Sequence, residues 1–441
     1  MRLLESLATT DPLEAVFSDA AFLAAMLHFE VALARAEARH GIIPPRAAEV
    51  IAQAADPQAF DAAAIARAAR ASGTVTIPFV EALTARVRAL DPGAETFVHW
   101  GATSQDVADT ALVLCLVQAR PVLDADCSRL ATALRRLSDE HADTIMLGRT
   151  LMQPAAPITF GLKSAGWFAA VTRCHRRLTS AFEEACVLQF GGASGTLAAL
   201  GGRGPVVATE LARELALPCP DAPWHTQRDR LAVLAADCGI LTATLGKIAR
   251  DVSLLMQHEI GEAAEPGGGS STMPQKRNPA GCALALAAAT RLPGLVASYV
   301  AGMVQEHERG LGGWHAEAVT VAGCVQATGA ALAAVAQVAE TLRVDSARMR
   351  ANVAATNTTI FAERAMVLLA PPLGRHAAAR LVAAAVESSR QEGRSFVEVL
   401  AASPDVAAVL GADADAWLGL PEQYLGSAEL FRRALLGTGT D

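Results

Sequence analysis

One segment in the second half of the chain gathers polar side chains between glycines and prolines. It reads Gly267-Gly268-Gly269-Ser270-Ser271-Thr272-Met273-Pro274-Gln275-Lys276-Arg277-Asn278-Pro279. The three glycines free the backbone, and the residues after them supply hydroxyls, amides and two cations. A flexible surface loop does not need so many hydrogen-bond donors. The segment therefore favours a glycine-hinged loop that closes over an anion and brings a proton-transferring side chain with it.

Two other segments carry a similar mixture of polar side chains. They read His99-Trp100-Gly101-Ala102-Thr103-Ser104-Gln105-Asp106 and Gly148-Arg149-Thr150-Leu151-Met152-Gln153-Pro154-Ala155-Ala156-Pro157. Together with residues 267–279, they resemble the three signature regions of the fumarase/aspartase superfamily in the same order. The last region matches the superfamily pattern G-S-S-x-M-P-x-K-x-N-P, which is long and specific. The resemblance covers nearly the whole chain.

Within that superfamily, the chain resembles the 3-carboxy-cis,cis-muconate cycloisomerase family. The segments that carry this resemblance are residues 189–195, 223–230, 305–309 and 314–317. Adenylosuccinate lyases share weaker versions of some of them, so a C–N lyase of that type is the first alternative. A non-catalytic structural member of the superfamily is the second alternative, although the intact set of Ser270, Lys276 and Asn278 argues against it.

The resemblance implies an intramolecular lyase that needs neither a cofactor nor a metal. A carboxylate of 3-carboxy-cis,cis-muconate would add to the conjugated double bond and leave a carbanion delocalised into a neighbouring carboxylate, an aci-carboxylate. Protonation of the carbanion carbon would give 4-carboxymuconolactone. This step belongs to the protocatechuate branch of the β-ketoadipate pathway. The partner is thus expected to be a small polycarboxylate.

The resemblance also implies roles for individual residues. Ser270 would transfer the proton, and Lys276 and Asn278 would hold substrate carboxylates and the developing charge. His99 is the candidate for an assisting acid, although His225, His307 and His315 also lie in family-like segments. The expected substrate contacts are Thr103, Ser104, Arg149, Thr150, Gln153, Gln227 and Arg309.

One position departs from the superfamily pattern. The second region usually reads G-R-T-H-x-Q, but here Leu151 stands in the place of the histidine. That histidine helps to protonate the leaving group, and amine or hydroxide leaving groups need such a proton. In the reverse of a lactonisation the leaving group is a carboxylate, whose conjugate acid has a pKa of about 4. Leu151 therefore favours a cycloisomerase over a C–N lyase, unless another histidine supplies the acid.

The elements that must position these residues are expected to be helices. The chain of 441 residues is 52% hydrophobic, only 5% aromatic and rich in alanine, a strong helix former. Apolar residues recur at alternating steps of four and three from Leu123 to Leu137 and from Leu234 to Leu255, a period typical of long helices packed side by side. Pro121 is expected to kink or break the helix that begins near Asp109.

These patterns predict an all-α fold of packed long helices, and the resemblance implies that it is of the fumarase/aspartase type. It would have an N-terminal helical domain at residues 1–110, a central long-helix bundle at 111–350 and a C-terminal helical domain at 351–441. The resemblance implies a homotetramer whose core is formed by the central helices, with each active site collecting residues from three subunits.

Charge and cysteine usage indicate the cellular setting. A net charge of −8 and a pI near 5.7 argue against nucleic-acid binding, which needs a positive face. The eight cysteines form no C-x-x-C pair and are expected to be buried, reduced thiols, and the N-terminus lacks the apolar core of a signal peptide. Residues 318–339 could span a bilayer by length, but they are mostly alanine with interspersed polar residues. We therefore expect a cytoplasmic protein with neither a metal nor a membrane partner.

Overall fold

The computed structural model describes residues 3–269, 272–411 and 418–437. By its internal contacts the chain divides into two units. Unit 1 comprises Met1–Ser128, Arg173–Gly246 and Leu284–Ala334, and unit 2 comprises Arg129–Thr172, Lys247–Ala283 and Val335–Asp441. The division into three domains that the sequence predicts stays a prediction.

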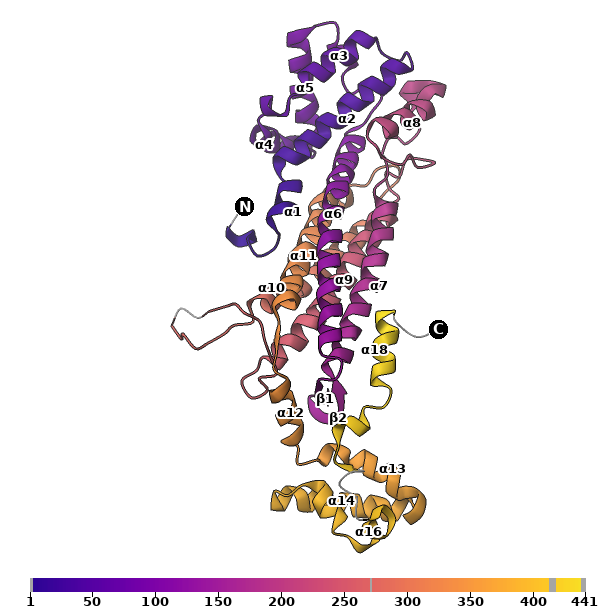
Figure 1. The fold of residues 1–441 in the computed structure, drawn as a ribbon. Coiled ribbons are helices and arrows are strands. Elements are labelled where there is room, and N and C mark those ends of the chain that lie inside the picture. The colour runs from indigo at the N-terminus through magenta and orange to yellow at the C-terminus, as the bar shows by residue number, and fades with distance from the viewer. Residues whose placement is uncertain (1–2, 270–271, 412–417, 438–441) are drawn as a thin grey trace. The chain divides into compact units, whose positions relative to one another are not determined.

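Five long helices have residues in both units (Figure 1). They are α6 (Ser104–Glu140), α7 (Phe160–Ala185), α9 (Asp229–Leu255), α10 (Ala280–Gly302) and α11 (Gly313–Thr341). The predicted apolar seams lie on α6 and α9, where every seam residue from Leu123 to Leu137 and from Leu234 to Leu255 is buried. The helical period in the sequence is thus confirmed as the packing period of the bundle.

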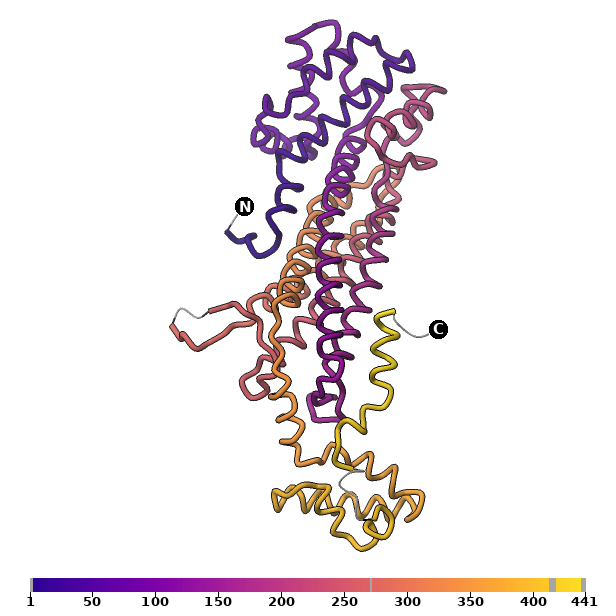
Figure 2. Tube along the Cα trace, in the orientation of Figure 1, coloured from indigo at the N-terminus to yellow at the C-terminus, as the bar shows by residue number. Residues whose placement is uncertain are grey.

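Within unit 1, specific contacts hold neighbouring long helices together. His175 on α7 contacts Asp124 on α6 at 2.7 Å, and Thr242 on α9 donates a hydrogen bond to Thr328 on α11. A Cβ at Gly239 on α9 would lie 3.2 Å from a methyl group of Val296 on α10, so the Val296 side chain packs against the α9 backbone at this glycine. The tube in Figure 2 shows the same helices running along one another.

The remaining helices and 3-10 turns lie before, between and after the long ones. Those of the N-terminal part are η1 (Leu3–Glu5), α1 (Asp11–Val16), α2 (Asp19–Arg39), α3 (Pro45–Ala54), η2 (Pro57–Ala59), α4 (Ala62–Ser72), α5 (Thr76–Leu90) and η3 (Glu95–Phe97). Between α7 and α9 are η4 (Ala198–Arg203) and α8 (Gly204–Glu214). The C-terminal ones are α12 (Ser346–Ala354), η5 (Thr359–Phe361), α13 (Ala362–Leu373), α14 (Arg375–Glu392), α15 (Phe396–Ala401), α16 (Pro404–Leu410), η7 (Pro421–Tyr424) and α18 (Ala428–Leu436).

Strands are few in the part of the chain that the structure describes. β1 (Ile145–Thr150) and β2 (Gln153–Thr159) form an antiparallel hairpin, and β3 (Ala263–Ala264) pairs with β4 (Arg343–Val344). The predicted all-α class is therefore confirmed. The hairpin was not predicted, because its second strand contains two prolines and its turn lacks the glycine or asparagine that usually marks such turns.

Two expectations from the sequence were wrong in detail. The expected break at Pro121 is wrong, because α6 runs from Ser104 to Glu140, whereas the expected kink stays a prediction. Leu116, Ala119 and Leu123 around it are fully buried, so packing on both sides outweighs the hydrogen bond that a proline cannot donate. The cysteines are all free, but Cys219 is exposed, since it follows α8 in a loop rather than a helix.

Candidate active site

The first group of site residues is organised around the N-terminus of α6. Thr103 precedes the helix, and the Asp106 carboxylate accepts a hydrogen bond from the Thr103 backbone N–H at 3.1 Å, as in a capping box. The same carboxylate accepts bonds from the backbone N–H groups of Gly191 and Gly192 and contacts His225 Nε2 at 2.7 Å. Asp106 therefore ties three distant segments of the sequence into one site.

Arg309 lies against the same two loops. Its guanidinium donates to the Thr103 hydroxyl oxygen at 2.5 Å and to the backbone carbonyls of Gly192 and Ala193 at 3.3 and 2.9 Å. Because the Thr103 oxygen accepts from Arg309, its own proton can point to another acceptor. The structure thus brings together two of the predicted substrate contacts, Thr103 and Arg309.

His99 is held in a strained position beside a buried carboxylate. Its φ of 59° lies in the left-handed region that few non-glycine residues adopt, and its Nδ1 contacts Glu30 on α2 at 2.6 Å. Burial opposes protonation of the ring, but the Glu30 carboxylate, with a smaller effect of Asp106, outweighs it and raises the pKa of His99 above its ordinary value. Such a histidine can carry a proton on Nε2 while Glu30 fixes its orientation.

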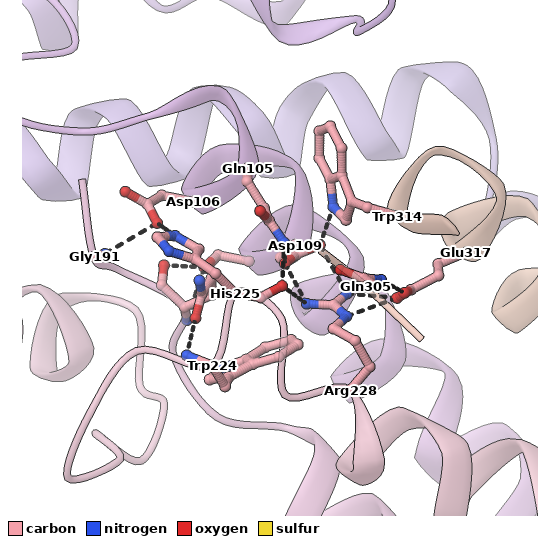
Figure 3. A network of polar contacts seen from close by, with 12 residues as sticks. Gln105, Asp106, Asp109, Gly191, Trp224, His225, Arg228, Gln305, Trp314 and Glu317 are labelled. Carbon is pink, nitrogen blue, oxygen red and sulfur yellow. Dashed lines mark hydrogen bonds and ion pairs between the residues drawn. The ribbon is translucent and has the colours of Figure 1, made fainter. Parts of the chain in front are cut away.

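A second polar network lies fully inside unit 1 (Figure 3). Arg228 is completely buried and donates two hydrogen bonds to Asp109 and two to Glu317. Its guanidinium also stacks on the Trp224 ring at 4.6 Å. Two carboxylates share one guanidinium, and burial raises the pKa of Glu317 although Arg228 opposes the shift.

Four uncharged side chains complete this network. Gln105 and Trp314 donate to Asp109, while Tyr299 and Gln305 donate to Glu317. The sequence did not reveal this arrangement, although Arg228 and Glu317 both lie in segments that carry the family resemblance. The sequence shows that a charged arginine and two acidic residues occur in an apolar chain. It does not show which of them pair.

The second group of predicted residues belongs to unit 2. Arg149 on β1 makes a two-pronged ion pair with the fully buried Glu262, with N–O distances of 2.9 and 2.6 Å. Asn352 on α12 donates to the same carboxylate at 2.7 Å. These contacts already occupy the Arg149 guanidinium, and its role as a substrate contact stays a prediction.

The turn of the β1–β2 hairpin carries the residue that departs from the superfamily pattern. Leu151 and Met152 have φ values of 48° and 66°, and their relative exposures are 98% and 71%. Thr150 and Gln153, both exposed, pair across the turn. Two residues of the turn thus adopt left-handed backbone conformations, and their apolar side chains are exposed to solvent. Such a combination of backbone strain and apolar exposure is typical of a functional position.

The signature segment also belongs to unit 2, and it closes on itself. The Asn278 backbone N–H donates a hydrogen bond to the carbonyl oxygen of Gly268 at 2.7 Å. Gly268 has a φ of 63°, and a Cβ at this position would collide with the Asn278 carbonyl. The Lys276 side chain is exposed. Ser270 and Ser271 lie outside the described residues. The glycine at position 268 is therefore required by both its conformation and the close approach of Asn278.

The predicted site residues thus fall into two sets. His99, Thr103, Ser104, Gln227 and Arg309 belong to unit 1, whereas Arg149, Thr150, Gln153, Lys276 and Asn278 belong to unit 2. Of the first set, Ser104 is half-buried and Gln227 is exposed. Among the residues that the structure describes, no group of three or more His, Cys, Asp or Glu side chains could hold a metal ion. The individual roles of these residues stay predictions.

A separate cavity of about 360 Å³ lies in unit 1. Its lining is mainly apolar and comes largely from α2, α4 and α11, including Met26, Ile65 and Val319. None of the predicted site residues lines it. Anion binding needs cations and hydrogen-bond donors, so the mainly apolar lining of this cavity does not suit the polycarboxylate that the sequence leads us to expect.

Glu37 provides a pH-dependent stability that can be measured. Both oxygens of this buried residue lack a hydrogen-bond partner, and burial, with the nearby Glu30, raises its pKa to about 9. In the unfolded chain the Glu37 carboxyl has its ordinary pKa of 4.5. The contribution of this group to stability is therefore fully present below pH 4.5 and is lost as the pH rises towards 9. The loss amounts to about 1.4 kcal/mol per pH unit.

We therefore expect Glu37→Gln, whose amide stays neutral, to melt at a higher temperature than the unmodified chain at pH 8.5 and to lose less stability between pH 6 and 8.5. The control is Glu49→Gln, which changes an exposed glutamate on α3. An identical pH dependence of melting temperature in the unmodified chain and Glu37→Gln would contradict the shifted pKa.

The whole chain is similar to known proteins in both sequence and structure. The lyase family model matches residues 5–294. The chain is 47% identical to a 3-carboxy-cis,cis-muconate cycloisomerase of Bradyrhizobium diazoefficiens, over 98% of this chain and 97% of that protein. It is 42% identical to a nitrosuccinate lyase of Streptomyces davaonensis, over 97% and 92%. The crystal structure of the 3-carboxy-cis,cis-muconate lactonizing enzyme from Pseudomonas putida is similar with a TM-score of 0.93 and 43% identity, over 99% of both chains.

Proposed function

Because this chain belongs to the lyase family, and within it to the 3-carboxy-cis,cis-muconate cycloisomerases, we propose that it closes 3-carboxy-cis,cis-muconate to 4-carboxymuconolactone. The observation that carries this proposal is whole-chain similarity to proteins of that name in both sequence and structure. The reaction is expected to belong to the protocatechuate branch of the β-ketoadipate pathway.

The chemistry needs binding of three negative charges and one proton transfer. A substrate carboxylate oxygen forms a bond to an alkene carbon, and the electron pair of that double bond moves to the neighbouring carbon. There it is delocalised into the attached carboxylate. A proton from the enzyme then bonds to that carbon, and nothing is released. The attacking carboxylate is ionised at neutral pH, so ring closure needs no base to activate it.

We assign one substrate carboxylate to the position where the Thr103 hydroxyl and the Arg309 guanidinium meet. The hydroxyl can donate outward because its oxygen accepts from Arg309. The cation beside it favours an anion. Lys276 and Asn278 are proposed to hold the carboxylate that takes up the developing charge, and Ser270 to deliver the proton. His99, with its raised pKa, is the proposed source that restores this proton.

The exposed turn at Leu151 supports lactonisation over C–N cleavage. At this position the chain presents an alkyl side chain that cannot donate a proton. An enzyme that expels an amine needs an acid near its leaving group, whereas the carboxylate of an opening lactone departs as a stable anion. The 42% identity to a nitrosuccinate lyase favours one second candidate, the release of nitrite from nitrosuccinate, since nitrite is also a weakly basic leaving group.

The proposal is tested by following the diene absorbance of 3-carboxy-cis,cis-muconate in the presence of the purified chain. We expect the absorbance to fall and the product to be the lactone. An unchanged absorbance under conditions in which nitrosuccinate is consumed would instead support the second candidate.

The surface of α10 supports an oligomer, and we propose a cytoplasmic location from the sequence alone. Within the described part of the chain, three helices, α9, α10 and α11, are long and apolar enough to cross a membrane by length and composition. More than half of the apolar window of α9 and α11 is buried within the chain, but only 22% of that of α10 is. An apolar helix that is so little buried within its own chain is typical of a subunit interface. We therefore propose a homotetramer whose composite sites combine the two residue sets from different subunits.

Composite sites predict complementation between inactive variants. His99→Asn changes a residue of unit 1, and Ser270→Ala changes the signature segment, so each variant alone is expected to be nearly inactive. After subunits of the two variants are mixed and exchanged, some sites would combine two intact sets, and part of the activity should return. Each variant incubated alone is the control. A monomer in light scattering, or no recovery after verified exchange, would contradict composite sites.

A further inference from the structure

The loop between α10 and α11 carries Arg309 and is closed at its base. A Cβ at Gly313, the first residue of α11, would lie 2.5 Å from the carbonyl oxygen of Gly302, the last residue of α10. The two ends of the loop therefore touch, and residues 303–312 project from this junction as one compact loop. Compact loops with adjoining ends are frequently functional.

Gln305 fills the inside of this loop. A Cβ at Gly310 would lie 2.8 Å from three carbons of the Gln305 side chain, so the glutamine packs against the residue next to Arg309. Its amide nitrogen donates to the Glu317 carboxylate at 2.5 Å and more weakly to the Gly302 carbonyl at 3.4 Å. Gln305 thus links the loop to a group outside it.

The group that receives this bond cannot easily move. Glu317 is buried, and Arg228, itself fully buried, donates to it twice. The other carboxylate of the network, Asp109, accepts a bond from Trp314 immediately after the loop at 2.9 Å. Figure 3 shows Gln305 and Trp314 directed at the two carboxylates from the same part of the chain. The buried ion pairs therefore anchor the loop at both ends.

We infer that Gln305 is a positioning residue for Arg309. By tying the loop to the Arg228–Glu317 ion pair, it holds the Arg309 guanidinium across Thr103 and the carbonyls of Gly192 and Ala193 before substrate arrives. Ordering this loop in advance removes an entropic cost from substrate binding. The kinetic consequence rests on the proposed function, but the ordering of the loop does not.

The chain offers a matched pair of variants. Gln305→Met keeps the size of the side chain but removes its bond to Glu317. Tyr299→Phe also removes one bond to Glu317, of 3.1 Å, but Tyr299 lies on α10 outside the loop. Hydrogen exchange of peptides covering residues 303–312 should rise about tenfold in Gln305→Met and stay unchanged in Tyr299→Phe, a size typical of losing one hydrogen bond to a charged group. Trp314→Phe, which cuts the second anchor, should raise exchange as well.

Kinetics separate positioning from a general loss of structure. Gln305→Met should raise KM for 3-carboxy-cis,cis-muconate about tenfold with little change in kcat, since it weakens binding rather than the chemical step. In an Arg309→Gln background the same substitution should add nothing, because its effect passes through Arg309. Equal loop exchange in Gln305→Met and Tyr299→Phe, or additive effects on KM, would overturn the inference. If the muconate is not a substrate, the exchange measurement still decides whether Gln305 orders the loop.

Discussion

Replacing Ser270 by alanine is expected to lower the turnover number by about 10²–10⁴-fold, the contribution typical of a positioned acid or base. The reason is its place in the signature segment, between the glycine hinge and the cation Lys276. The folded chain should hardly change, so circular dichroism and melting temperature should stay close to those of the unmodified chain. Turnover and stability are measured on the same preparation.

The neighbouring hydroxyl provides the control for this experiment. Ser271→Ala removes a side chain of the same kind from the same segment, and we expect it to retain most of the turnover. If both variants lost activity equally, the segment would need its hydroxyls for closure rather than for proton transfer. Turnover of Ser270→Ala near that of the unmodified chain would remove Ser270 from the mechanism.

Of the substitutions proposed for this chain, Arg228→Met is expected to lower the free energy of unfolding the most. The substitution keeps most of the apolar volume but leaves Asp109 and Glu317 buried without their shared cation. Removing one partner of a buried ion pair costs about 3–5 kcal/mol, because the remaining charge cannot be solvated. Denaturant unfolding monitored by tryptophan fluorescence and circular dichroism gives the difference in free energy of unfolding.

Arg230→Met is the matched control for this prediction. Arg228 immediately precedes α9, whereas Arg230 lies in the first turn of that helix, and its guanidinium donates to the Glu184 carbonyl near the surface. We expect its replacement to change the free energy of unfolding by less than about 0.5 kcal/mol, as is usual for surface positions. Similar losses in the two variants would mean that the buried network does not stabilise unit 1 as its geometry indicates.

The sequence predicted the parts of the fold that depend on local periodicity. The apolar steps from Leu234 to Leu255 define a buried helix face whatever the rest of the chain does. The continuity of α6 through Pro121 was not predictable in the same way. It depends on neighbours of Leu116 and Leu123 that are remote in the sequence, and those neighbours override the local preference of proline.

The candidate site shows the same division between local and remote information. Residue types and motif order pointed to Thr103 and Arg309, which the structure places in contact although 206 positions separate them in the sequence. The pairing of Arg228 with Asp109 and Glu317 spans 119 and 89 positions, and no local pattern encodes which carboxylates a buried arginine will meet. The strained turn at Leu151 was equally hidden, since leucine and methionine have no preference for positive φ.

Lactonisation by this chain is tested by comparing kcat/KM for five substrates under identical conditions. These are 3-carboxy-cis,cis-muconate, nitrosuccinate, adenylosuccinate, argininosuccinate and malate. We expect the muconate to have by far the highest kcat/KM and the product, identified by NMR, to be 4-carboxymuconolactone with no second product released. Efficient turnover of any of the other four, with none of the muconate, would contradict this expectation.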